Sequence, residues 1–369
     1  MGIRETTTAI TSDKNAKDRP LYLRIGEGDS SVWFVIEDKR KEQQREEDDE
    51  IIFRRLDLPQ LGYQRFLDSL VVLNSKLYLI GGTKINLNKP TCPVPVGEPV
   101  REYEYLNLQE RRLRWRRQPF RRFLYTQHLA SCKDGLIYGL GPQSHVIDPA
   151  LRFGVIHTDL PKIPGEYGHS PQPLAISKNK IYAYSRGGVY PNLQHYLFSY
   201  DMEEKTWECI FKNFWGDWAT GVVLSGDSYL IAYGSRHPIE WKKDRPGVWV
   251  FDIHRRQWLD EPVKGLDEAL PVIPDWVYEE LGYVHVYYLP RLFEIGKHRF
   301  ALIWEESDDE SYNESYTLHC HKFTLQAPTS TDQPFVARQL SNKVKTLNGG
   351  NNKILGCTVG LESEQGREE

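Results

Sequence analysis

VVLNSKLYLIGG (71–82) is an apolar run, a short polar turn and a second apolar run that ends in two glycines. Two apolar runs joined by a few turn residues are the signature of a β-hairpin. The same order recurs in LASCKDGLIYGLG (129–141), LAISKNKIYAYSRGG (174–188), VVLSGDSYLIAYGS (222–235) and LFEIGKHRFALIW (292–304). Hairpins that align in this way along a chain indicate an all-β repeat protein.

A second hairpin-like element follows most of these repeats. It consists of an apolar residue, a charged turn and an aromatic residue, as in LQERRLRW (108–115), YDMEEKTW (200–207), FDIHRRQW (251–258) and the shorter IDPALRF (147–153). Two hairpins per unit, at a mean period of about 50 residues, give the four strands of a propeller blade. The pattern therefore predicts one β-propeller, although the length would allow two ordinary domains.

Glycine-ended hairpins followed by Tyr-Asp, with Trp207 seven residues after Tyr200, resemble the kelch repeat. The resemblance covers roughly residues 20–360 and is to the plant type, here without an F-box-like segment in front. It is weaker in the third repeat, which lacks the Trp, and in the sixth, where Trp304-Glu305-Glu306 stands in place of the glycines. It implies a propeller of the galactose oxidase-like superfamily, some members of which are enzymes.

Strands from the two ends of the sequence together supply one further blade. LYLRIG (21–26), SVWFVIED (31–38) and IIFRRLDL (51–58) supply three strands, whereas KILGCTVG (353–360) is a lone strand. We expect the lone strand to be the innermost strand of blade one, because closure removes the open sheet edges that invite aggregation. The predicted fold is an all-β, six-bladed kelch-type β-propeller over 20–360, with its ring closed by the C-terminal strand.

Polar segments without periodicity flank the predicted propeller. Residues 1–19 form the N-terminal one and residues 361–369 the C-terminal tail, and a Ser/Asn/Gly-rich stretch covers 341–352. Terminal and polar segments of this kind are usually poorly ordered. We expect all three to be mobile.

Bulk composition limits the compartment and the class of partner. The net charge of −4 is too small to indicate nucleic acid or membrane by itself. The five cysteines are scattered and lack CxxC spacing, which indicates free thiols in a reducing compartment. No apolar stretch approaches the roughly 18 residues of a membrane span. The sequence predicts a cytoplasmic or nuclear protein with no membrane contact and no cofactor.

The run His319-Cys320-His321 places two imidazoles on one face of a strand, because side chains alternate between faces. Two such ligands can begin a metal site, but the sequence offers no third ligand at a defined spacing. We therefore interpret both as structural histidines and predict no metal site.

The segment RRLRWRRQPFRRF (111–123) interleaves arginines with aromatic residues, a pattern that can serve nucleic acid. Alternation along an outer strand would instead place many of these arginines on a solvated face. The insertion KRKEQQREEDDE (39–50) in blade one carries an acidic end on the same side of the ring, by strand count. We favour pairing between this acidic end and the arginine-rich turn at 109–112 over nucleic-acid binding.

Loop length separates the two faces of the predicted ring. The first-to-second strand turns are short, whereas the second-to-third and inter-blade connections are long, and function concentrates on long loops of rigid scaffolds. Candidate ligand-binding residues at the start of inner strands are Arg65, His128, His169, Trp218 and Arg291. Those on the long loops are Arg186, Arg236, His237, Glu240 and Trp241.

Arginines beside aromatic residues suit an anionic or extended peptide, through bidentate hydrogen bonds and stacking. The leading functional hypothesis is a scaffold that binds a protein or peptide partner through the long-loop face. The alternative is a small-molecule enzyme, a lyase or isomerase at the channel mouth similar to the specifier proteins of glucosinolate breakdown. Their Glu-xxx-Asp-xxx-His iron pattern is missing from this sequence, and no catalytic residues are assigned.

Overall fold

The structure is a computed structural model, and the part of the chain that it describes is made of β-strands and their turns. The described residues are 18–27, 30–39, 50–59, 65–66, 69–84, 98–100, 102–119, 127–130, 135–141, 144–151, 158–163, 171–177, 179–187, 194–212, 217–223, 228–235, 247–266, 270, 290–296, 298–307, 315–326, 334–348 and 353–359.

Five four-stranded antiparallel sheets are each built from one continuous stretch of chain. We number them two to six. Sheet two contains β5 (Ser69–Leu73), β6 (Lys76–Ile80), β9 (Glu102–Asn107) and β10 (Arg116–Pro119), and sheet three contains β11 (Gln127–Ala130), β12 (Ile137–Leu140), β13 (His145–Ile147) and β14 (Thr158–Asp159). Sheet four contains β15 (Gln172–Ile176), β16 (Lys180–Gly187), β17 (Gln194–Asp201) and β18 (Thr206–Lys212). Sheet five contains β19 (Asp217–Val223), β20 (Tyr229–Ser235), β21 (Gly247–Asp252) and β22 (Gln257–Trp258), and sheet six contains β23 (Arg291–Gly296), β24 (Arg299–Ser307), β25 (Ser315–Gln326) and β26 (Val336–Asn348).

A further four-stranded sheet, sheet one, combines both ends of the chain. Its strands are β1 (Leu21–Glu27), β2 (Ser30–Lys39), β3 (Glu50–Leu56) and the late strand β27 (Lys353–Val359). β27 pairs antiparallel with β1, and Leu23 lies opposite Cys357. Sheet one therefore depends on residues more than 300 positions apart in the sequence, because residue 23 pairs with residue 357.

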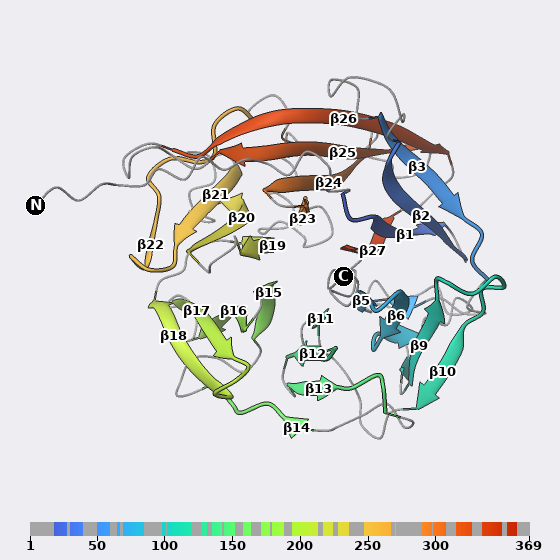
Figure 1. Ribbon diagram of the computed structural model, residues 1–369, viewed down its shortest axis with the longest axis horizontal. Coiled ribbons are helices and arrows are strands. Elements are labelled where there is room, and N and C mark those ends of the chain that lie inside the picture. Colours follow the sequence, from blue (N-terminus) through green and yellow to red (C-terminus); the bar gives the residue numbers. More distant parts are fainter. Residues whose placement is uncertain are drawn as a thin grey trace, which may run out of the picture.

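The sheets stand around a common axis, with one edge strand of each nearest the centre (Figure 1). The inner strands are β27, β5, β11, β15, β19 and β23, and each of them contacts the inner strand on either side of it. Radially arranged four-stranded antiparallel sheets define a β-propeller. The sequence-based prediction of an all-β propeller is confirmed.

The apolar core lies between neighbouring sheets rather than in one central layer. Six clusters of buried side chains each combine residues of two adjacent sheets. Leu23 and Ile36 of sheet one, for example, belong to one cluster with Ile303 and Cys320 of sheet six. Each sheet therefore buries apolar side chains on both of its faces, as expected for sheets packed face to face.

Two tryptophans of the repeat motif fasten one sheet to the preceding one. The indole N–H of Trp115, beside β10, donates to the carbonyl of Pro59 just beyond β3, at 2.7 Å. The indole N–H of Trp207, on β18, donates in the same way to Pro161 just beyond β14, at 2.8 Å. Buried indoles usually need a partner for this polar edge, so a repeated Trp-to-Pro contact explains why Trp recurs at this position.

Ion pairs fasten the segment before β1 to sheet six. Asp18 lies 3.0 Å from Arg299 Nε and 3.6 Å from Lys322 Nζ, and the side chains of Asp18 and Lys322 are only 3% and 2% exposed. The backbone N–H of Arg19 donates to the Ile295 carbonyl at 2.6 Å, and the Arg19 guanidinium lies 3.8 Å from Glu294. Asp18 and Arg19 therefore pack against sheet six, although the sequence placed them at the end of a mobile segment.

The outer strand of sheet six also reaches sheet one. Lys345 on β26 lies with its Nζ 4.5 Å from the ring centroid of Phe34 and 6.0 Å from that of Phe53. β26 continues to Asn348, so the prediction of a mobile 341–352 stretch is wrong for 341–348. Pairing along β25 and the contact of Lys345 with aromatic rings hold this polar segment in place.

The chain that leaves sheet five forms a strap along sheet six. The backbone N–H of Lys264 donates to the Phe335 carbonyl at 3.0 Å, and Ala337 donates back to the Lys264 carbonyl at 2.8 Å. Gly265 follows with a φ of +85°, and a Cβ added there would lie 2.6 Å from the Ala337 carbonyl oxygen. Only a residue without a side chain fits this close approach.

A small three-stranded sheet lies apart from the four-stranded sheets. It pairs β4 (Arg65–Phe66) with β7 (Thr83–Lys84), and β7 with β8 (Glu98–Pro99). Its strands come from the segment before β5 and from the connection between β6 and β9.

Candidate binding surface

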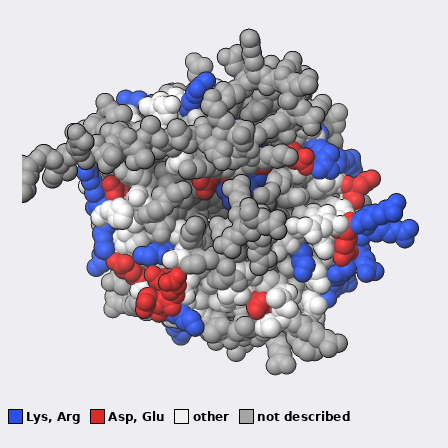
Figure 2. Space-filling model, in the orientation of Figure 1, with Lys and Arg blue, Asp and Glu red and all other residues white. Residues whose placement is uncertain are grey.

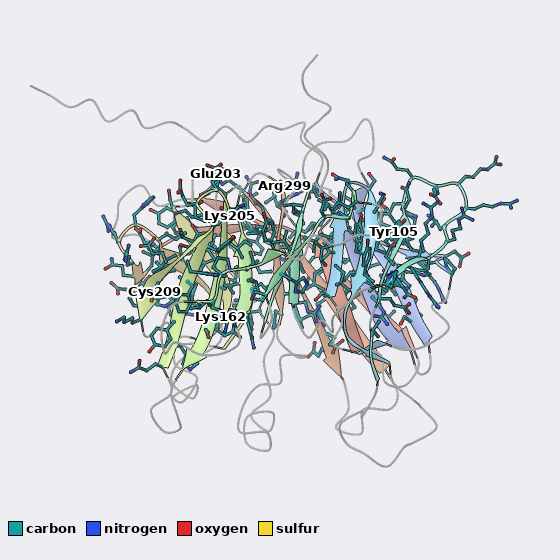
Figure 3. All side chains as sticks on the ribbon, turned by 90° about the horizontal axis from the view of Figure 1, so that it is seen from below. Tyr105, Lys162, Glu203, Lys205, Cys209 and Arg299 are labelled. Atoms are coloured by element: carbon teal, nitrogen blue, oxygen red, sulfur yellow. The ribbon has the colours of Figure 1, made fainter. Side chains whose placement is uncertain are left out.

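The two edges of the ring differ in the connections that they carry. Only two residues separate β5 from β6 and β23 from β24. In Figure 3, Glu203 and Lys205 in the turn between β17 and β18 and Arg299 at the start of β24 lie at one edge, which we call the turn face. The opposite edge, where inner strands begin and second strands end, is the loop face.

Longer connections leave from the loop face. Segment 188–193 joins β16 to β17, segment 236–246 joins β20 to β21, and segment 308–314 joins β24 to β25. The connection from β22 of sheet five to β23 of sheet six also arrives there and runs from 259 to 290. The strand limits agree with the predicted separation of short turns and long loops in sheets four and five. They do not agree with it in sheet one, where only 28–29 join β1 to β2 at the loop face and 40–49 join β2 to β3 at the turn face.

Four of the ten predicted site residues lie on strands at or near the loop face. Inner strands carry His128 (β11), Trp218 (β19) and Arg291 (β23). Arg186 lies near the end of β16, directly opposite His195 on β17. Of these four, only Arg291 has a described side chain, and it is half-buried.

The other predicted residues do not lie on inner strands in the described part of the chain. Arg65 lies on β4, opposite Lys84, and not on inner strand β5, which begins only at Ser69. RFLDSLVVL contains no Gly or Pro that would mark the break between β4 and β5. The remaining predicted residues, His169, Arg236, His237, Glu240 and Trp241, lie outside the described residues.

Sheet four presents fixed polar groups at the loop face. The Tyr184 hydroxyl donates to Gln172 Oε1 at 2.5 Å, which joins β16 to the first residue of β15. The Tyr196 hydroxyl donates to Oε1 of Gln194, the first residue of β17. Both glutamines are exposed, while Tyr184 and Tyr196 are buried, so rigid aromatic stems orient two solvent-facing amides. Amides held in this way can donate to and accept from an extended peptide backbone.

Sheet six carries a second polar constellation, on β24 and β25. The ring of Trp304 stacks on both His319 and His321, with each pair of ring centroids 4.8 Å apart. His319 Nε2 lies 2.9 Å from Glu306 Oε2, whose side chain is 58% exposed, and His321 is buried. The stacking supports a structural part for both histidines. Across the described residues, no group of three or more His, Cys, Asp or Glu could hold a metal ion.

Burial, and next the neighbouring His319, lowers the pKa of His321 to about 4. We therefore expect the free energy of unfolding to fall by roughly 2 kcal/mol between about pH 7 and pH 5. In that interval the unfolded imidazole binds a proton and the folded one does not. The contribution is complete above the ordinary pKa of 6.5 and is lost as the pH falls toward 4. Urea unfolding at both pH values measures the change.

The matched variants for this pH dependence are His321→Leu and His254→Leu. His254 is exposed in the turn between β21 and β22, so its replacement should leave the pH dependence as in the wild type. His321→Leu should remove most of it. Equal pH dependence in His321→Leu and the wild type would show that burial of this imidazole does not control stability.

The arginine-rich segment pairs with carboxylates of its own sheet. Arg116 forms an ion pair with Glu110, and Arg117 Nε lies 2.7 Å from Oε1 of the fully buried Glu104. The acidic insertion at 39–50 that the sequence suggested as a partner has only its ends, Lys39 on β2 and Glu50 on β3, among the described residues. Local pairs therefore account for two of these arginines, and the role of the insertion stays a prediction.

Sequence reasoning missed the two glutamines and the Glu306–His319 pair. Gln172 follows a proline and opens a strand, which gives no chemical signal by itself. Glu306 and His319 are 13 positions apart, and only the pairing of β24 with β25 brings them together. Of the acid–base groups that an enzyme could use at this face, Asp217 opens β19, while His237 and Glu240 fall outside the described residues.

Comparisons with known proteins bear on the fold only. No protein-family profile matches this chain, and no curated protein matches it. A solved nidogen/laminin complex is 9% identical, with a TM-score of 0.47 over 93% of this chain and 98% of that one. The solved structure of YjhT is also 9% identical, with a TM-score of 0.48 over 89% of this chain and 100% of that one. Likenesses this distant carry no argument about function, and the propeller assignment rests on the sheets themselves.

Proposed function

We propose that this chain is a scaffold that recognises a protein or peptide partner through the loop face of its propeller. The observation that carries the proposal is the difference between the two edges in sheets four and five, where the connections between second and third strands are longer than the turns at the opposite edge. Ligand-binding residues are concentrated on loops that a rigid scaffold positions. The exposed amides of Gln172 and Gln194 add fixed hydrogen-bonding groups at that edge.

We further propose that the ring has six blades of the kelch type and that β27 closes it. Three observations support this. Sheet one combines β27 with β1, the buried clusters link all six sheets in sequence around the axis, and Trp115 and Trp207 repeat one contact with a proline carbonyl. Free thiols and the lack of an apolar span in the sequence favour the cytoplasm or nucleus as its location. In the described residues, no helix is long and apolar enough to cross a membrane.

Affinity purification from the source cells tests the binding face. The triple variant Arg236→Ala, His237→Ala and Trp241→Ala changes the connection between β20 and β21 at the loop face. Its matched control, Glu203→Ala, Glu204→Ala and Lys205→Ala, changes the β17–β18 turn at the turn face (Figure 3). We expect the first variant to lose most partners that the wild type captures and the second to keep them.

Both triple variants should first unfold at the urea concentration of the wild type, so that lost capture reports binding. Loss of partners in the turn-face variant alone would place the binding surface on the turn face and overturn the proposal. Retention of all partners in the loop-face variant would do the same.

The alternative, a lyase or isomerase at the channel mouth, requires acid–base groups that converge near the inner strands. One contact between a histidine and a carboxylate in the described part of the chain is His319–Glu306, on the second and third strands of sheet six. Those strands are set back from the innermost position, so this pair does not favour catalysis in the channel.

A further inference from the structure

An exposed group of arginines lies on the turn between β9 and β10, on the opposite side of the ring from the loop face. Arg111, Arg112 and Arg114 are all exposed, and none of them forms an ion pair with a described residue. Lys and Arg side chains gather on the right-hand rim in Figure 2, with Asp and Glu side chains between them, where Figure 1 places β3, β9 and β10. We call these three residues the arginine turn.

Only some of the arginines in this region are paired with described carboxylates. Arg116 and Arg117, which follow the arginine turn on β10, are each matched by a carboxylate of sheet two, Glu110 and Glu104. Glu110 and Glu104 are thereby already paired within the sheet, and the acidic insertion at 39–50, favoured above as a partner of this turn, would compete with an external anion. The positive charge of Arg111, Arg112 and Arg114 faces solvent, where an external anion can reach it.

Backbone and side-chain contacts hold the arginine turn at its N-terminal end. The N–H of Leu108 donates to the Ser75 carbonyl at 2.8 Å, and Gln109 Nε2 donates to Ser75 Oγ at 3.1 Å. The N–H of Gln109 donates to Asn107 Oδ1 at 3.0 Å. These bonds attach the turn to the β5–β6 hairpin of its own sheet.

Aromatic contacts hold the C-terminal end of the arginine turn. Trp115 donates to the Pro59 carbonyl, and its ring lies 5.7 Å from that of Trp33. Leu113 packs in the same cluster between sheets one and two. The guanidinium groups therefore extend from a backbone that is fixed before any ligand arrives, which reduces the ordering cost of binding.

The chemistry of the arginine turn favours a short carboxylate-rich segment over nucleic acid. Guanidinium groups bind carboxylates with two parallel hydrogen bonds. Single-stranded nucleic acid also needs aromatic faces on which its bases can stack. Trp115, the aromatic residue of this turn, is half-buried against Trp33 with its N–H engaged. The net charge of −4 further opposes a long polyanion that would extend beyond this turn.

We propose that the arginine turn is a second interaction surface, which binds an acidic segment of a partner polypeptide. Arg111, Arg112 and Arg114 are its specificity-determining residues. It lies on the turn face and is separate from the surface proposed for the loop face.

Fluorescence anisotropy with a labelled peptide of alternating Glu and Asp tests this surface at about 50 mM and about 200 mM salt. We expect the wild type to bind the peptide at the lower concentration and more weakly at the higher one. Combined replacement of Arg111→Ser, Arg112→Ser and Arg114→Ser should weaken binding at least about tenfold. The control triple Arg255→Ser, Arg256→Ser and Arg338→Ser makes the same change in net charge elsewhere on the molecule and should weaken binding less than about twofold.

Three results would overturn the proposal. They are an equal loss in both triple variants, no binding of the peptide by the wild type at low salt, or tighter arginine-dependent binding of an oligothymidylate of equal length. The loop-face variant at 236, 237 and 241 should bind the acidic peptide like the wild type. This measurement distinguishes failure of the proposal for the arginine turn from failure of the proposal for the loop face.

Discussion

Asp18→Asn is expected to lower the free energy of unfolding by about 3–5 kcal/mol, as removal of one partner from a buried charge cluster typically does. Asp18 is the carboxylate that contacts both Arg299 and Lys322, and Lys322 is 2% exposed. The amide that replaces it carries no charge, so a buried ammonium loses its counter-charge while it stays out of water. Chemical denaturation followed by tryptophan fluorescence measures the effect.

Glu261→Gln is the matched control for Asp18→Asn. Glu261 pairs with Lys264 at 2.6 Å, but both side chains are more than half exposed, and such surface pairs contribute about 0–1 kcal/mol. Adding Lys322→Met to Asp18→Asn should restore part of the lost stability, because the double variant no longer buries the ammonium. Equal stability of Asp18→Asn and Glu261→Gln would mean that the cluster does not hold sheet six to the segment before β1.

Gly265→Ala is expected to lower the free energy of unfolding by about 3 kcal/mol. A left-handed conformation costs a residue with a side chain on the order of 1 kcal/mol, and overpacking adds about 1–3 kcal/mol. Both apply here, because φ is +85° and the new Cβ would lie 2.6 Å from the Ala337 carbonyl oxygen. To relieve the clash between the new Cβ and the Ala337 carbonyl oxygen, the strap must move away from sheet six. This movement breaks the hydrogen bonds of Lys264 with Phe335 and Ala337.

Gly247→Ala provides the control for this substitution. A Cβ at Gly247 meets Pro262 and Trp249 at 3.6 and 3.7 Å, which is ordinary van der Waals contact, and its φ is not positive. Its stability should stay within about 1 kcal/mol of the wild type. Amide hydrogen exchange gives a second measurement, since Gly265→Ala should increase exchange at Lys264 and Ala337. Unchanged protection at these two amides would contradict the account of the strap.

Local sequence pattern was sufficient to identify the propeller. The run at 71–82 becomes β5 and β6, with the turn residues Asn74 and Ser75 at positive φ, as a tight hairpin requires. Each later hairpin of the same pattern also forms neighbouring antiparallel strands. These features were predictable because a hairpin joins residues close in sequence, and its apolar periodicity is complete within one short segment.

Features that depend on distant partners were not predictable from the same pattern. Residues 341–348 lack apolar periodicity and were predicted to be mobile, yet they pair along β25 and place Lys345 over Phe34. The buried ion pairs of Asp18 could not be predicted, because its partners Arg299 and Lys322 are about 300 positions away in sequence. Half of the predicted binding residues belong to connections with no periodicity from which a position could be read, and they lie outside the described residues.

The pairing of β27 with β1 has a consequence for synthesis of the chain. The edge of β1 that faces β27 has no partner until residues 353–359 have been made, after the strands of the other five sheets have been synthesised. Strand pairing over such a separation is slow, and an open strand edge in the interval is a site for pairing with another chain. The nascent protein is therefore most vulnerable to misassembly at its earliest strand, and protection of that edge by a chaperone would matter more than protection of any later hairpin.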